Sequence, residues 1–167
     1  MENNYILSLL IWLPVLGMVA IAFIPREKEN SIKIAAAITT GVQFIITLIL
    51  WNGFDLQNGG MQKNEMYNWI PSFNISYHLG VDGLSLPMVI LTGLLFFIGV
   101  FVSWNIKKAV KGYFALFLML NTGVMGVFLS LDFFLFYIFW EVMLLPMYFL
   151  IGLSLIHISE PTRHRYI

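Results

Sequence analysis

The chain has 167 residues, of which 59% are hydrophobic and 11% are charged, and its mean hydropathy is +0.84. Soluble domains carry about a quarter charged residues, so this composition excludes an ordinary soluble domain and predicts an integral membrane protein. A formal net charge of zero, no cysteine and only three histidines argue against nucleic-acid binding and against metal, haem or iron–sulfur sites within the chain.

Five apolar runs are long enough to cross a hydrocarbon core, which takes about 20 helical residues. The first run resembles a signal peptide, but it lacks a basic n-region and its apolar part is too long. We therefore predict an all-α, polytopic helix bundle with five transmembrane helices over residues 1–152. The predicted spans are Tyr5–Ile24, Ile34–Trp51, Leu84–Trp104, Tyr113–Leu131 and Phe133–Gly152.

Basic residues between the runs predict the orientation in the membrane. Two short connections are basic, whereas the long connection from Asn52 to Val81 carries only Lys63. The positive-inside rule places the basic connections in the cytoplasm, and it places the long loop and the N-terminus outside. We expect every lysine to lie in a loop, so that none can pair with a carboxylate inside the membrane. The lysines are Lys28, Lys33, Lys63, Lys107, Lys108 and Lys111.

The long outer loop contains one patterned segment, "PSFNISYHLGV". Apolar and polar residues alternate strictly from Phe73 to Val81, which predicts a short half-buried strand, half of a hairpin on the outer face. Its lone His78 is interpreted as a polar-face residue rather than a ligand.

Acidic residues stand directly before two of the predicted helices. In "VDGLSLP", Asp82 or Ser85 is expected to cap free N–H groups at the start of the third span, and direct ion handling by Asp82 is the alternative. Asp132 is similarly expected to cap the fifth span. The fourth and fifth spans meet almost without a linker, so we predict that they are antiparallel neighbours.

Glu141 is the candidate catalytic residue, because it is the one carboxylate between Phe133 and Gly152. It lies about 12 Å along its helix at 1.5 Å per residue, near the membrane midplane. An ionised carboxylate at that depth costs about 2.5–3.5 kcal/mol, so such residues mark proton or ion relays. The structural alternative is a protonated side chain that forms a packing hydrogen bond.

Several neighbours of Glu141 are predicted to support a relay. Pro146 has no N–H, which frees the carbonyl of Val142 and favours a kink where water binds. Tyr137 and Tyr148 share the helix face of Glu141, where their hydroxyls either extend a hydrogen-bonded chain or merely pack. In the fourth span, Asn121 and Thr122 lie at a similar depth, and we expect one of them to bond Glu141 or its water.

The C-terminal segment differs from the rest of the chain. "LSLIHISEPTR", residues 153–163, resembles the translation of a transposase adapter used in sequencing-library preparation. We therefore expect residues 153–167 not to be natural protein and the natural chain to continue differently. The alternative is a genuine amphipathic cytoplasmic tail.

Two motifs carry a family resemblance. "YHLGVDGLSLPMVILT" (residues 77–92) and "FYIFWEVMLLPMYFLIG" (residues 136–152) resemble the NADH–quinone oxidoreductase subunit M (chain 4) family, antiporter-like subunits of respiratory complex I. The resemblance extends over residues 1–152 and implies the N-terminal fragment of a larger subunit with two inverted five-helix repeats. It also implies a bacterial inner membrane location and a proton-relay role for Glu141, which pairs with a lysine beyond this chain.

The resemblance further implies an enzyme subunit without its own redox centre. FMN, iron–sulfur clusters and quinone are expected in partner subunits, and the partners are the other membrane subunits of complex I and the lipid bilayer. Two alternatives stay open. One is a subunit of a Mrp-type cation/proton antiporter or membrane-bound hydrogenase, and the other is a small structural or assembly membrane protein.

Overall fold

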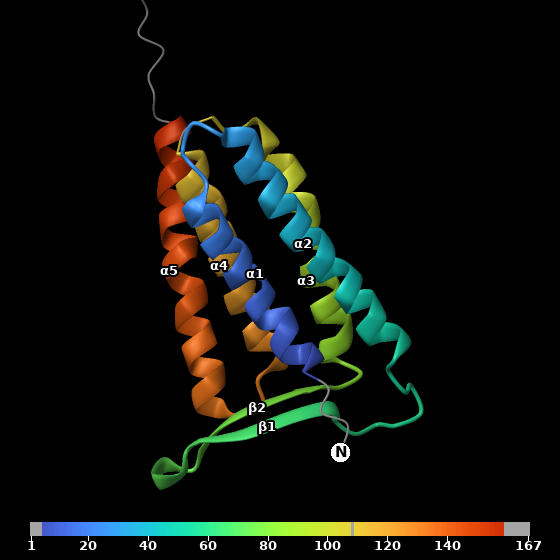
Figure 1. Ribbon diagram of the computed structural model, residues 1–167. Coiled ribbons are helices and arrows are strands. Elements are labelled where there is room, and N and C mark those ends of the chain that lie inside the picture. The colour runs from blue at the N-terminus through green and yellow to red at the C-terminus, as the bar shows by residue number, and fades with distance from the viewer. Residues whose placement is uncertain (1–4, 108, 159–167) are drawn as a thin grey trace, which may run out of the picture.

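The computed structural model describes residues 5–107 and 109–158, without the side chains of residues 153–158. Within these ranges five helices are long and apolar enough to cross a membrane, as predicted. Consecutive helices run in opposite directions in one bundle (Figure 1). The helices are α1 (Ile6–Phe23), α2 (Glu29–Asn52), α3 (Ser85–Val102), α4 (Val110–Leu129) and α5 (Phe133–Ile158).

The described residues include only part of the segment for which an adapter origin is predicted, residues 153–167. Helix α5 runs six residues past Gly152, to Ile158, and residues 159–167 lie outside the described part of the chain. The proposed adapter origin of residues 153–167 therefore stays a prediction.

Two helices begin earlier than the apolar pattern predicts. Helix α2 starts at Glu29 rather than Ile34, and α4 starts at Val110 rather than Tyr113. The expectation that every lysine lies in a loop is therefore wrong for Lys33 and Lys111, which belong to helices, and for Lys63, which lies in the strand Gln62–Ile70. Lys108 lies outside the described residues. A helix satisfies its own backbone groups, so it can extend past the apolar span through polar residues.

The outer loop forms the predicted hairpin. Strand β1 (Gln62–Ile70) pairs antiparallel with β2 (Ile75–Val81), joined by a 3₁₀ turn at Pro71–Phe73. The prediction that the strand begins at Phe73 is wrong, because the left-handed φ of 57° at Asn74 ends the turn there. The hairpin lies across the end of the bundle where α1, α3 and α5 begin (Figure 1).

Helix α4 is central and contacts all four other helices. It packs closely against α5, its predicted antiparallel neighbour, because two glycines face that helix. A Cβ atom at Gly123 would lie 2.9 Å from the backbone of Met143, and Gly126 packs directly on the ring of Phe139. Small residues allow such close approach between membrane helices, where dispersion contacts drive association.

The buried side chains form two apolar clusters, one toward each end of the bundle. The cluster at the hairpin end includes Leu10, Leu79 and Met125, and the other includes Ile21, Ile32 and Phe114. Polar residues Gln43 and Asn121 are completely buried at intermediate depth.

Candidate functional site

Glu141 lies on the face of α5 that points away from α4. Phe139 and Met143 contact the glycines of α4 on either side of it in the sequence. Two residues along a helix correspond to a rotation of about 200°, so Glu141 faces the opposite direction from Phe139. Its side chain is accordingly exposed in this chain.

An open hollow of about 630 Å³ contains the Glu141 side chain. Helix α4 contributes Met119 to its wall, and the remaining walls come from α5. Apart from Glu141 and Tyr148 the lining is apolar, so Glu141 is the one carboxyl group in the lining. The lining residues are Met119, Glu141, Val142, Leu144, Leu145, Tyr148 and Phe149.

The two tyrosines lie as the helical spacing predicts. Tyr137 lies one turn before Glu141 on α5, and Tyr148 lines the same hollow as Glu141. Both rings are exposed, at 53% for Tyr137 and 75% for Tyr148. Pro146 is buried within an uninterrupted α5. The three residues thus occupy one stretch of α5 around the carboxylate.

The expected direct bond from Asn121 or Thr122 to Glu141 is not formed. Asn121 is fully buried and its Nδ2 donates to Gln43 Oε1 at 2.5 Å, while Gln43 Nε2 donates to the Leu10 carbonyl oxygen at 2.9 Å. Thr122 Oγ1 donates to the Leu118 carbonyl oxygen of its own helix at 3.2 Å. The direct bond is absent from the described residues because Asn121 faces Gln43 of α2, whereas Glu141 faces outward from α5. A water-mediated link stays untested.

The structure instead gathers Gln43 and Asn121 into a polar link among α1, α2 and α4. Asn121 Oδ1 accepts no hydrogen bond from the described residues, although it is buried. Sequence reasoning found the depth of Asn121 and missed Gln43. The signal was present, because Gln43 is the one amide side chain within the predicted second span.

The predicted caps at Asp82 and Asp132 are formed. Asp82 Oδ1 accepts from the backbone N–H of Ser85 at 2.7 Å, and Ser85 Oγ accepts from the N–H of Asp82 at 3.0 Å. This reciprocal pair satisfies free donors at the start of α3. The bond from the Ser85 N–H is the main reason that the pKa of Asp82 lies below its ordinary value.

Asp132 has a second role beyond its helix cap. Oδ1 accepts from the N–H of Phe134 at 2.9 Å, and Oδ2 accepts from the N–H of Ser76 in β2 at 3.0 Å. The Ser76 bond is the largest contribution that lowers the pKa of Asp132. Asp132 therefore fixes the hairpin to the start of α5.

Glu65 in β1 was missed by sequence reasoning. Its side chain is only 5% exposed, and its carboxylate accepts from the N–H of Leu7 at 2.8 Å and from the N–H of Ser8 at 3.1 Å. The Ser8 hydroxyl also bonds this carboxylate. The cap acts between residues more than 50 positions apart, and "QKNEMYNWI" lacks the alternation that would mark Glu65 as inward-facing.

The described residues contain no group of three histidine, cysteine, aspartate or glutamate side chains close enough to hold a metal ion. The site is thus a single carboxylate with tyrosine neighbours. Its available chemistry is proton uptake and release.

Comparison with known proteins identifies the relatives of the chain. No family model matches it. It is 43% identical over 155 residues to NADH-quinone oxidoreductase subunit M of Escherichia coli strain K12, covering 87% of this chain and 30% of the relative. The chain is a homologue of subunit M (chain 4) proteins. The resemblance of its two motifs to this family is therefore confirmed.

Two further relatives carry names of the same kind. NADH-ubiquinone oxidoreductase chain 4 of Arabidopsis thaliana is 38% identical over 152 residues, covering 90% of this chain and 31% of the relative. NADH-quinone oxidoreductase subunit M of Rhodobacter capsulatus is 37% identical over 157 residues, covering 92% and 30%. The chain thus spans about a third of the length of these subunit M and chain 4 relatives.

A solved structure shares the fold. A chain of respiratory complex I from Thermus thermophilus with bound NADH matches with a TM-score of 0.68 and 22% identity. The match covers 84% of this chain and 27% of that one. The fold of this chain therefore resembles part of a larger chain of that complex.

Proposed function

We propose that the chain is part of a proton-translocating membrane subunit of NADH:quinone oxidoreductase, in which Glu141 takes up and releases protons. The observation that carries this proposal is the position of Glu141, near the middle of the membrane-length part of α5 (Phe133–Gly152) and on the face that this bundle leaves uncovered. The homology to subunit M proteins supports the reaction to which the proton movement is coupled.

Because Glu141 is exposed in this bundle, its carboxyl group needs a polar or cationic neighbour from outside the bundle. An ionised carboxylate facing lipid at mid-membrane depth is costly, so it needs water or a cation beside it. We infer that a helix beyond the five described here covers the hollow and brings a cation toward Glu141. A nearby positive charge stabilises the carboxylate, and withdrawal of that charge favours the protonated acid. Moving the cation would thus load and release one proton at this side chain.

The proposal assigns no redox step to this chain. FMN, iron–sulfur clusters and quinone belong to partner subunits of the assembled complex, and other membrane subunits of that complex are the partners of this chain. Electron transfer in the partners would change the charge beside Glu141, and this chain would convert that change into proton movement.

The proposed location is a bacterial inner membrane with the N-terminus and the hairpin outside. The chain has no cysteine, so single introduced cysteines report sidedness cleanly. We expect a membrane-impermeant maleimide to label Asn58→Cys in intact spheroplasts and Glu27→Cys only after permeabilisation. The reverse pattern would contradict the orientation.

The test of the relay is Glu141→Gln in the complete subunit, assembled in its complex. The substitution retains size and hydrogen bonding but cannot ionise, so we expect loss of most NADH-driven proton transfer into membrane vesicles. Glu27→Gln, the same change in a loop between α1 and α2, is the matched control and should leave proton transfer unchanged. Normal proton transfer by an assembled Glu141→Gln complex would reject the role.

A further inference from the structure

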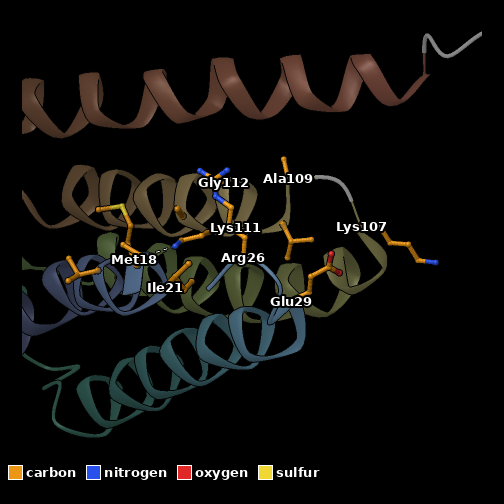
Figure 2. A pocket seen from close by; sticks show the side chains of 12 residues that line it. Met18, Ile21, Arg26, Glu29, Lys107, Ala109, Lys111 and Gly112 are labelled. Carbon is orange, nitrogen blue, oxygen red and sulfur yellow. Dashed lines mark hydrogen bonds between the residues drawn. The ribbon is translucent and has the colours of Figure 1, made fainter. Parts of the chain in front are cut away.

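A second hollow, of about 710 Å³, opens at the end of the bundle opposite the hairpin, between the end of α1 and the start of α4 (Figure 2). We call it the basic hollow. Its walls are apolar along both helices and its rim is charged. The walls include Met18, Val19, Ile21, Ala22 and Ala115, and the charged residues are Arg26, Glu29, Lys107 and Lys111.

The charge at this rim is positive. Three cations and one carboxylate give a net charge of +2, from +3 and −1. Arg26 lies in the loop after α1, Lys107 in the segment before α4, and Lys111 in α4, so only the fold brings them to one hollow. Arg26 and Lys107 are exposed. Both remain accessible to a ligand.

Lys111 is held in a fixed position at the hollow. Its Nζ donates to the carbonyl oxygens of Ala22 at 2.8 Å and Ile24 at 2.9 Å. An ammonium group has three N–H donors, so one remains for a ligand. Lys111 therefore presents a fixed positive charge without the entropy cost of ordering a free lysine.

The start of α4 adds backbone donors to the same place. Val110 and Gly112 line the hollow, and no side chain of the described residues caps this helix, whose N-cap residue Ala109 has φ 50° and ψ 36°. The Tyr113 N–H donates to the Ala109 carbonyl oxygen, and an α-helix leaves the N–H groups of its first turn without acceptors inside the helix. Their partial positive charge reinforces the cations at the rim.

A ligand that matches both the charged rim and the apolar walls of the basic hollow must be an anion with an apolar tail. A soluble anion would use the rim alone and leave the walls of α1 and α4 unused. Basic pockets between membrane helices bind the headgroups of anionic lipids, and this hollow lies at the end of five membrane-length helices. We propose that the basic hollow binds one anionic phospholipid, with its phosphate at Arg26, Lys111 and the start of α4 and an acyl chain along Met18 and Ala22.

The first test measures lipid selectivity. The chain is placed in nanodiscs of phosphatidylcholine and phosphatidylglycerol, and the lipid that it retains after release is counted by native mass spectrometry. We expect retention of phosphatidylglycerol over phosphatidylcholine, and a fall of about fivefold for each charge removed by Arg26→Gln and Lys107→Gln. Lys28→Gln and Lys63→Gln, basic residues that do not line the hollow, are the controls and should change nothing.

A second variant separates binding from folding. A Cβ atom at Gly112 meets no atom within 4 Å, so Gly112→Glu fits sterically. A carboxylate in the first turn of a helix is favourable, and glutamate is a better helix former than glycine. This variant should therefore keep its fold while its negative charge reduces phosphatidylglycerol retention to the level of phosphatidylcholine. Gly59→Glu makes the same change at a glycine that does not line the hollow and where a Cβ atom also meets no atom within 4 Å, so this control should retain the lipid.

Two outcomes would overturn the proposal. One is equal retention of both lipids by the unmodified chain, or phosphatidylglycerol retention that is unchanged in Arg26→Gln, Lys107→Gln and Gly112→Glu. The other is binding of inorganic phosphate that competes fully with the lipid at millimolar concentration and depends on the same residues. That result would assign the hollow to a soluble anion.

Discussion

The two ends of the bundle satisfy their helix termini with opposite charges. At the hairpin end, carboxylates bind the free N–H groups at the starts of α1, α3 and α5: Glu65, Asp82 and Asp132. At the basic end, ammonium groups bind free carbonyl oxygens. Lys111 bonds Ala22 and Ile24 at the end of α1, and Lys33 donates to the Trp104 carbonyl oxygen at 2.7 Å, just after α3.

This difference follows from the direction of the helices. Helices α1, α3 and α5 begin at the hairpin end and finish at the basic end, so their first N–H groups lie near the acids and their last carbonyl oxygens lie near the lysines (Figure 1). Acids at one end and lysines at the other are therefore both stabilising. The lysines whose distribution predicts membrane orientation have a second, structural use at the helix ends.

The two ends also differ in how far apart in sequence the partners lie. Asp82 and Asp132 cap helices that begin within three residues of them. Lys33 binds a carbonyl 71 residues away, and Lys111 binds one 89 residues away. Glu65 resembles the lysines in this respect, since its partner Leu7 is 58 residues away. Sequence distance, rather than charge sign, separates the contacts that were predicted from those that were missed.

The largest expected effect comes from removing Glu65. Glu65→Ala leaves the buried N–H of Leu7 without an acceptor and removes the charge at the start of α1, so we expect about 2–3 kcal/mol less stability to unfolding in mixed micelles. Glu65→Gln keeps an acceptor and should lose about half as much. Hydrogen exchange gives a local readout, with faster exchange at Leu7 and Ser8 but not at Ser85. Equal stability of Glu65→Ala and the unmodified chain would contradict the cap.

Local signals therefore predicted much of the fold. Five apolar runs of about twenty residues predicted the five helices, and the alternation around His78 predicted β2. The strand β1 was missed because its sequence lacks alternation, and only Glu65 within it is buried. The early start of α2 was missed because its first turn is polar, although the helix is continuous from Glu29.

The membrane depth of the site residues could be predicted from the sequence, but the directions in which their side chains face could not. Counting residues along helices placed Glu141 and Asn121 at similar levels, and spacing within α5 placed Tyr137 beside Glu141. The rotation of α5 about its axis depends on where Phe139 and Met143 meet the glycines of α4, which is a contact between helices. Such contacts between helices cannot be read from spacing within one helix, so the contact between Asn121 and Gln43 was not predicted.

The next largest expected effect is a loss of stability from substitutions at the basic end of the bundle. Lys33 is only 5% exposed, so Lys33→Met leaves the Trp104 carbonyl oxygen with little access to water, and we expect a loss of about 1–2 kcal/mol. Lys111→Met should cost less, about 0.5–1 kcal/mol, because water can reach the carbonyl oxygen of Ala22. Unfolding in mixed micelles measures both. A larger loss at Lys111 than at Lys33 would show that exposure does not govern these contacts.

The smallest effect is the pH dependence of the hairpin end. Hydrogen bonds from the N–H groups of Ser85 and Ser76 hold the pKa values of Asp82 and Asp132 below the ordinary value of 3.8. A group with a lowered folded pKa contributes stability above its unfolded pKa and loses it as pH falls through the folded pKa. The loss therefore occurs below about pH 4.

Because both aspartates are partly exposed, we expect each to contribute less than about 1 kcal/mol. Asp132→Asn should lower stability at pH 7, yet it should bring the stabilities at pH 7 and pH 3 closer together, since asparagine does not titrate. Asp55→Asn, in the loop before β1, is the matched control and should keep the full acid-induced loss. Lys33→Met should also keep that loss, because lysine stays charged throughout this range. An acid-induced loss that disappeared in Lys33→Met would place the pH response at the basic end and break the distinction between the two ends.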